Sequence, residues 1–150
     1  MAYTETENAI IDAIEGLTPY SKPAITFKRI RGARSWPADP VANSGKLRAF
    51  EFIPLTTVRG TAANGTGAKQ LIASCQLLVY YPMGELADEH RQRLQEDKNS
   101  LMELLESIDW YDFNNTGLQN IQWITDTTQS KDGNMVLVVT LQVTYFSRGT

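Results

Sequence analysis

The sequence contains one histidine and one cysteine, the side chains that most often supply nucleophilic, acid–base or metal-binding chemistry. His90 lies among charged residues and has no second histidine at helical spacing with which to share a metal. We therefore expect His90 to be a solvated surface residue. Cys75 lies within an alternating apolar segment, and its neighbours Ser74 and Gln76 carry no positive charge that would activate a thiol. We expect Cys75 to be a core residue.

Other catalytic patterns are missing as well. No glycine-flanked turn surrounds a serine that could act with His90 in a hydrolase triad. The glycine-rich segment 60–69 resembles a phosphate-binding loop, but Thr66 replaces the lysine expected after Gly65 and a strand-like segment follows. We expect a hairpin tip there, and we predict no enzyme activity, no cofactor and no metal. Catalysis by carboxylates alone is the remaining enzymatic alternative, with Asp109, Asp112, Asp126 and Asp132 as its candidates.

Charge is unevenly distributed along the chain. Residues 22–69 contain nine basic and two acidic residues, whereas the rest contains five basic and fifteen acidic residues. A basic region on an acidic body favours oriented contact with nucleic acid or with the acidic surface of a neighbour. Arginines beside a tryptophan can stack on bases or fill a protein interface, and a solvated loop is the third alternative. The candidates for assembly or phosphate contact are Arg29, Arg31, Arg34, Trp36, Arg48 and Arg59.

Apolar spacing predicts two helices. Thr4 and Glu7 form a capping-box pattern, and the aliphatic residues that follow indicate a helix over about 5–15. A long charged helix is predicted over 86–108, with an apolar stripe made of Leu94, Leu101, Met102, Leu104, Leu105 and Ile108. Because the first half of this helix is nearly all polar, we expect its packing to be concentrated in the second half.

Strand-like composition predicts five strands, over 24–30, 47–57, 71–81, 118–127 and 135–146. In the first, Ile25, Phe27 and Arg29 are expected to share one face. Pro54 predicts an edge position or a bulge in the second. Both faces of the last strand are apolar, which predicts a central position in the sheet.

The connections between these strands follow from glycine and proline. A long loop is predicted over 31–46, after the first strand. The second and third strands are expected to form a hairpin whose flexible tip spans 58–69. An Asp-Gly pair at 132–133 favours a second hairpin between the last two strands.

These elements predict an α+β fold in which residues 1–150 form a single domain: a mostly antiparallel five-stranded sheet with two helices, in the order α-β-β-β-α-β-β. A hydrophobic content of 42% and a charged content of 21% are typical of a folded domain. The sequence shows neither a secretory signal nor an apolar run of about 18 to 20 residues that could span a membrane. One cysteine allows no internal disulfide, so we expect a protein made in a reducing cytoplasm.

The order of elements resembles that of the tail terminator (tail completion) proteins of long-tailed bacteriophages. The similar features are an acidic first helix over 4–16, the long loop after the first strand, the hairpin over 47–81, the Tyr81-Pro82 break before the charged helix, and a closing hairpin that ends at 143–148. The resemblance covers nearly the whole chain, and the family has no catalytic fingerprint.

The resemblance implies a ring, normally a hexamer, that caps the tail tube, stops its polymerisation and presents a surface to the head. The implied partners are further copies of the chain, the tail tube protein and a head-completion or connector protein, with DNA in the lumen as a further contact and no membrane. The implied location is the tail or neck of the virion, after assembly in the host cytoplasm. Complementary charges on identical subunits would favour head-to-tail contacts that close into a ring. The alternatives are a nucleic-acid-binding module that uses the basic loop, or another neck, connector or tail-tube protein.

Overall fold

The computed structural model describes residues 2–20, 25–29, 47–63, 69–82, 87–107, 118–131 and 133–147. Its elements are α1 (Ala2–Glu15), β1 (Lys28–Arg29), β2 (Ala49–Ala63), β3 (Lys69–Pro82), α2 (Ala87–Ser107), β4 (Leu118–Lys131) and β5 (Asn134–Ser147). This order confirms the predicted α+β fold. The predicted loop over 31–46 lies outside the described residues.

The five strands form one sheet in the order β1-β2-β3-β5-β4. All neighbouring pairs are antiparallel except β1 and β2, which run parallel over two residues. The last strand, β5, lies between β3 and β4, so its predicted central position is confirmed. Its consecutive residues Met135 and Val136 point to opposite faces and are both buried.

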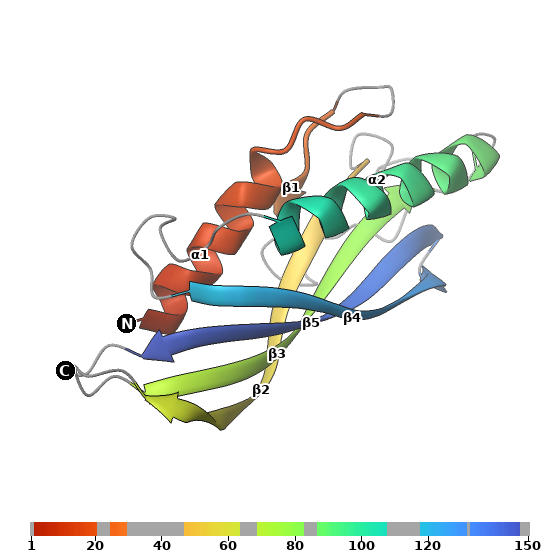
Figure 1. Ribbon diagram of the computed structural model, residues 1–150. Coiled ribbons are helices and arrows are strands. Elements are labelled where there is room, and N and C mark those ends of the chain that lie inside the picture. The colour runs from red at the N-terminus through yellow and green to blue at the C-terminus, as the bar shows by residue number, and fades with distance from the viewer. Residues whose placement is uncertain are drawn as a thin grey trace.

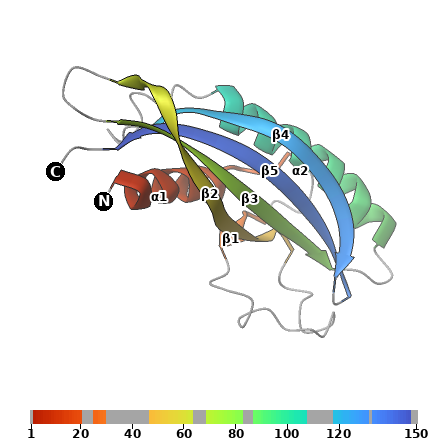
Figure 2. The ribbon, with the colours of Figure 1, turned by 90° about the horizontal axis from the view of Figure 1, so that it is seen from below.

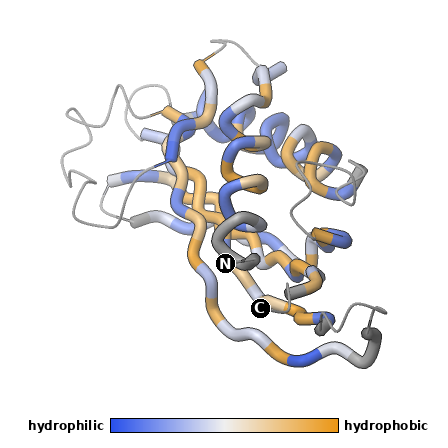
Figure 3. Tube along the Cα trace, turned by 90° about the vertical axis from the view of Figure 1, so that its left-hand side faces the viewer, coloured by the Kyte–Doolittle hydropathy of each residue, from blue (hydrophilic) through white to orange (hydrophobic). Residues whose placement is uncertain are grey.

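Both helices lie on the same face of the curved sheet (Figures 1 and 2). The main core forms between that face and the helices, and the hydrophobic stretches of the central strands are visible in Figure 3. Cys75 is fully buried in this core, as predicted. The core-facing residues of the two central strands alternate along the chain: Ala73, Cys75, Leu77, Val79 and Tyr81 on β3, and Met135, Leu137, Val139, Leu141, Val143 and Tyr145 on β5.

The opposite face of the sheet, which we call the open face, has a smaller apolar cluster at one end. Ala49, Tyr80 and Val136 are buried there, with Leu78 and Val138 packed against them. The hydroxyl of Tyr80 donates a hydrogen bond of 2.6 Å to Oε1 of Glu51 on the adjacent strand. This bond satisfies the polar end of a tyrosine that is otherwise buried.

The β2–β3 hairpin is confirmed, but its strands are longer than predicted. Pairing runs from Ala49 opposite Tyr80 to Ala63 opposite Lys69, so residues 58–63 belong to β2 rather than to a flexible tip. Pairing with β3 overrides the loop-like composition of this segment. A register shift between Pro54 and Thr57 confirms the predicted bulge. Residues 64–68 lie outside the described residues.

The second predicted hairpin, between β4 and β5, is also confirmed. Lys131 pairs with Asn134, which leaves a two-residue connection. Gly133 has a φ of 76°, in the left-handed region that glycine adopts without steric cost.

Two predictions near the N-terminus need correction. Helix α1 begins at Ala2, so Thr4 lies inside the helix and not at its cap, and Glu7 pairs with Arg29 instead. The first strand is only two residues long, with Ile25 46% exposed while Phe27 is buried. The carbonyl of Ile25 accepts a hydrogen bond of 3.0 Å from Nη1 of the Arg48 side chain.

The packing of α2 also differs from the prediction. Its buried residues follow one another at intervals of three and four, and they are His90, Leu94, Asp97, Leu101 and Leu105. The first half of the helix is therefore packed against the rest of the protein as closely as the second. Polar side chains occupy two of the buried positions, which is why hydrophobicity alone did not reveal them.

Candidate functional site

The structure describes three of the six candidate contact residues, namely Arg29, Arg48 and Arg59. The other three, Arg31, Arg34 and Trp36, lie in the basic loop outside the described residues.

Arg48 is fully buried between the sheet and α2. Its Nε lies 2.6 Å from Oδ2 of Asp97 and its Nη2 lies 3.2 Å from Oδ1, so the guanidinium and the carboxylate form a two-pronged ion pair. The guanidinium carbon lies 5.8 Å from the centre of the Phe27 ring, within the range of a cation–π contact. The positive charge of Arg48 is thus neutralised inside the protein.

Tyr81 completes this buried polar cluster, which we define as Arg48, Asp97 and Tyr81. The Tyr81 hydroxyl donates a hydrogen bond of 2.6 Å to Oδ2 of Asp97, the same oxygen that Nε of Arg48 contacts. Burial, and next the negative charge of Asp97, hold the pKa of Tyr81 well above its ordinary value, so the phenol stays protonated as a donor. The Asp97 carboxylate therefore accepts three hydrogen bonds, two from Arg48 and one from Tyr81.

The backbone of Arg48 ties three strands together. Its N–H donates to the carbonyl of Tyr80 at 3.0 Å, and its own carbonyl accepts from the N–H of Lys28 at 3.3 Å. Its φ of 66° lies in the left-handed region, which is unusual for a residue with a side chain. The surrounding bonds hold this conformation in place. We therefore interpret the buried polar cluster as a structural link between α2 and the sheet. Arg48 is not accessible to a phosphate group or to a neighbouring subunit.

His90 corrects another expectation, because only 8% of its surface is exposed. Its Nδ1 lies 3.0 Å from Nη1 of Arg93, one helical turn later. Since a guanidinium only donates, Nδ1 must accept, and we assign the neutral ring with its proton on Nε2. Burial, and next the adjacent Arg93 charge, lower the pKa of His90 from its ordinary 6.5.

Arg29 and Arg59 do not form one site with each other. Arg29 is half-buried, and its Nη2 lies 3.3 Å from Oε1 of Glu7, which joins β1 to α1. Arg59 is exposed on β2. The partner of Arg29 in β2 is Phe50, so about 30 Å of extended strand separates this level from Arg59.

Asp97 and Tyr81 were missed by the sequence analysis, although a signal for each was present. Asp97 occupies a position in the same helical stripe as Leu94, Leu101 and Leu105. Tyr81 continues the alternation of core residues along β3. A charged residue inside an apolar stripe predicts a buried partner of opposite charge, because an unpaired buried charge is very costly.

Within the ranges that the structure describes, no group of three or more histidine, cysteine or acidic side chains is arranged to hold a metal ion. None of the helices in those ranges combines the length and the apolar composition needed to cross a membrane.

In comparisons with protein-family models and with curated protein sequences, no match to the chain was found.

Proposed function

We propose that this chain is a structural subunit of a bacteriophage tail, a ring-forming tail terminator that caps the tail tube and joins it to the head-side connector. The observation that carries the proposal is the fold: its order α-β-β-β-α-β-β is the order on which the resemblance to this family rests. The virion tail or neck is the corresponding location.

The chemistry of the described residues supports an assembly role. Arg48, Asp97 and Tyr81 bond to one another inside the domain, and Arg29 is paired with Glu7, so these charges stabilise the domain. The β2–β3 hairpin is long, with β2 spanning 15 residues and β3 spanning 14. An extended hairpin offers a surface on which neighbouring subunits can pack.

The nucleic-acid alternative has less support from the described candidates. Arg48 is buried and Arg29 is paired with Glu7, which leaves Arg59 as the exposed member among the three. Phosphate contacts would give an affinity for DNA that falls steeply with salt. Binding of double-stranded DNA across a salt series starting at about 50 mM therefore distinguishes the two functions.

The direct test of the proposal uses the full chain and a purified bacteriophage tail tube protein. Native mass spectrometry and negative-stain microscopy should show closed rings, and the rings should sit on the ends of the tubes. Adding the chain during tube polymerisation should shorten the tubes in proportion to its concentration. A protein that stays monomeric and leaves the tube length distribution unchanged would contradict the proposal.

A further inference from the structure

Among the described residues the sheet has two edges without a partner strand, and they match one another in strand direction, bulge position, side chains and bordering charge. Beyond Phe50, no described strand pairs with the outer side of β2, because β1 reaches only Ala49 and Phe50. At the opposite end of the sheet, no described strand pairs with the outer side of β4. Free edges are surfaces on which further chains assemble.

The first match is in strand direction. β2 is antiparallel to β3, β3 to β5, and β5 to β4. β2 and β4 therefore run in opposite directions. When two copies are placed side by side in the same orientation, the β4 edge of one lies antiparallel to the β2 edge of the next.

The second match is in the level of the bulges. The pairing register places Pro54 opposite Cys75, Cys75 opposite Leu141, and Leu141 opposite Trp123, in one row across the sheet. One of the two register shifts of β2 follows Pro54, and one of the two register shifts of β4 follows Trp123. Each edge thus departs from regular pairing at the same level, so two neighbouring copies would bring bulge against bulge.

The third match is in side-chain chemistry. Large apolar side chains are exposed at both bulges: Leu55 in β2 is 50% exposed and Ile124 in β4 is 53% exposed. Val58, 58% exposed, extends the apolar part of the β2 edge. Contiguous exposed apolar surface marks protein contacts, and a second copy would bring Leu55 and Val58 of one edge together with Ile124 of the other.

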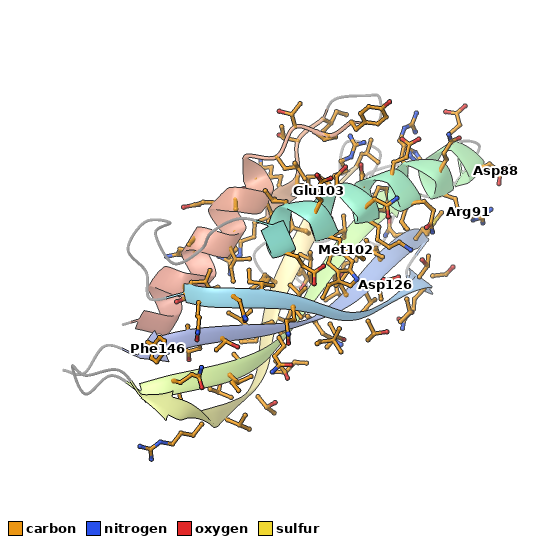
Figure 4. All side chains as sticks on the ribbon, in the orientation of Figure 1. Asp88, Arg91, Met102, Glu103, Asp126 and Phe146 are labelled. Carbon is orange, nitrogen blue, oxygen red and sulfur yellow. The ribbon has the colours of Figure 1, made fainter. Side chains whose placement is uncertain are left out.

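The charges that border the two edges are also complementary. Lys28 and Arg59 are exposed on the β1–β2 side. On the β4 side, Glu103 and Glu106 are exposed in the last two turns of α2, which have no basic residue in the final turn. Figure 4 shows Glu103 on α2 and Asp126 on the neighbouring β4. Opposite charges around an apolar centre favour contact between unlike edges over contact between like edges.

The bond network of the β4 edge determines the kind of contact. Oε2 of Glu106 already accepts the N–H of Trp123 at 3.1 Å, so that backbone donor is occupied. The indole Nε1 of Trp123 donates to Oδ2 of Asp126 at 2.9 Å, and Nζ of Lys98 lies 3.4 Å from Oδ1 of Asp126. This edge is therefore firmly held and partly capped, and it offers side chains rather than a continuous ladder of backbone groups.

From these matches we propose that copies of this chain pack edge to edge, with Leu55 and Val58 on the β2 edge of one subunit against Ile124 on the β4 edge of the next. The contact joins two different surfaces, so a rotation axis roughly parallel to the strands closes it into a ring. This inference rests on the proposed function, in which the chain forms rings, and it identifies the surface that builds them.

Cysteine cross-linking in the full chain tests the contact, because the native Cys75 is fully buried and does not take part. We expect the double variant Leu55→Cys, Ile124→Cys to give, under mild oxidation, a ladder of covalent oligomers that ends at the ring. Each single variant alone should stay monomeric on a non-reducing gel. A mixture of the two single variants should give a covalent dimer and nothing larger.

Two outcomes would overturn the contact. Covalent dimers of Leu55→Cys alone would show that like edges meet. A double variant that stays uncross-linked while the unmodified chain forms rings in native mass spectrometry would place the interface elsewhere and leave the proposed function intact. Cross-linked rings that do not shorten tail tubes would support the contact while contradicting the proposed function.

A matched pair of surface variants provides a second test. Leu55→Asp should raise the subunit dissociation constant by at least about tenfold, because it places a desolvated charge at the apolar centre of the contact. Tyr20→Asp changes a residue that is 85% exposed and lies on neither edge, so it should change that constant less than about twofold. Equal effects of the two variants, measured at equal helix and strand content by circular dichroism, would contradict the proposal.

Discussion

The two halves of α2 pack against the same sheet by different means. In the second half, Leu101 and Leu105 are fully buried among aliphatic side chains. In the first half, His90 and Asp97 are buried, and Asp97 is held by Arg48 and Tyr81. One face of a helix can therefore be buried along its whole length even where polar residues such as His90 and Asp97 join Leu94 on that face, provided that the buried polar groups find partners.

The difference also predicts how each half responds to mutation. In the aliphatic half, the loss of stability follows the volume removed, and neighbouring side chains can partly fill the space. In the polar half, removing one partner leaves the other partner charged and buried. A single substitution should therefore lower the stability more in the polar half than in the aliphatic half. Removing both members of the ion pair together should lower the stability less than removing one of them.

The largest effect is expected for Asp97→Ala. This substitution leaves the Arg48 guanidinium buried without a counter-charge, and it should lower the free energy of unfolding by about 3–5 kcal/mol. Urea unfolding followed by tryptophan fluorescence measures the change. The control is the double variant Arg48→Met, Asp97→Leu, which removes both charges at similar volume and should recover most of the loss. If the double variant is as unstable as Asp97→Ala, the ion pair itself does not explain the stability.

In the aliphatic half, Leu101→Ala should lower the free energy of unfolding by about 2–5 kcal/mol, with an expected value below that of Asp97→Ala. The cause is a cavity between α2 and the sheet, together with the lost burial of the side chain. The same urea titration measures it, and Leu101→Met, which keeps most of the volume, is the matched control with an expected loss below about 1.5 kcal/mol. A loss as large for Leu101→Met would point to strain rather than to a cavity.

Within the polar half, Tyr81→Phe tests a single hydrogen bond. It removes the donor to Oδ2 of Asp97 but leaves both contacts from Arg48, so we expect a loss of about 1.5–3 kcal/mol. Introducing the substitution into the Arg48→Met, Asp97→Leu background should cost much less, because the acceptor is then absent. Equal losses in the two backgrounds would show that the hydroxyl does not act through Asp97.

The smallest effect is expected for the titration of His90. Its pKa is lowered in the folded protein from the ordinary 6.5, so below that pH the unfolded chain binds the proton more readily than the folded one. The contribution of His90 to stability is complete above about pH 6.5, and it is lost as the pH falls through 6.5 toward the folded-state pKa. Urea midpoints between pH 5 and pH 8 measure this, and His90→Gln should flatten that part of the profile. An unchanged slope in His90→Gln would assign it to other groups.

The sequence predicted the fold well wherever a single periodicity dominated. The alternating apolar residues of β5 predicted its central position, and the Asp-Gly pair and Pro54 predicted a turn and a bulge. It predicted less well where partners come from distant parts of the chain. The extension of β2 through residue 63 depends on pairing with β3, and the carbonyl of Ile25 bonds to the side chain of Arg48, 23 residues away.

The candidate residues were selected by charge, and charge alone does not distinguish a surface arginine from a buried one. Arg48 and Arg59 have the same side chain and lie on the same hairpin, yet one is fully buried and the other is exposed. Arg48 differs from Arg59 in having a buried partner, because Asp97, 49 residues away in the sequence, lies in the buried stripe of α2. The sequence alone does not relate the exposed aliphatic residues of the two sheet edges to one another either. Only the pairing register shows that Leu55 and Ile124 lie at one level of the sheet.

The position of β5 also affects how the protein is made. The ribosome synthesises β5 after every other element of the described fold, yet this strand fills the centre of the sheet between β3 and β4. Until β5 emerges, β4 lacks the described strand with which it pairs, and the apolar residues of β3 lack their partner on that side. The nascent chain must therefore wait for its last strand before the core can close, and a chaperone that shields β3 during this interval would raise the yield of folded protein.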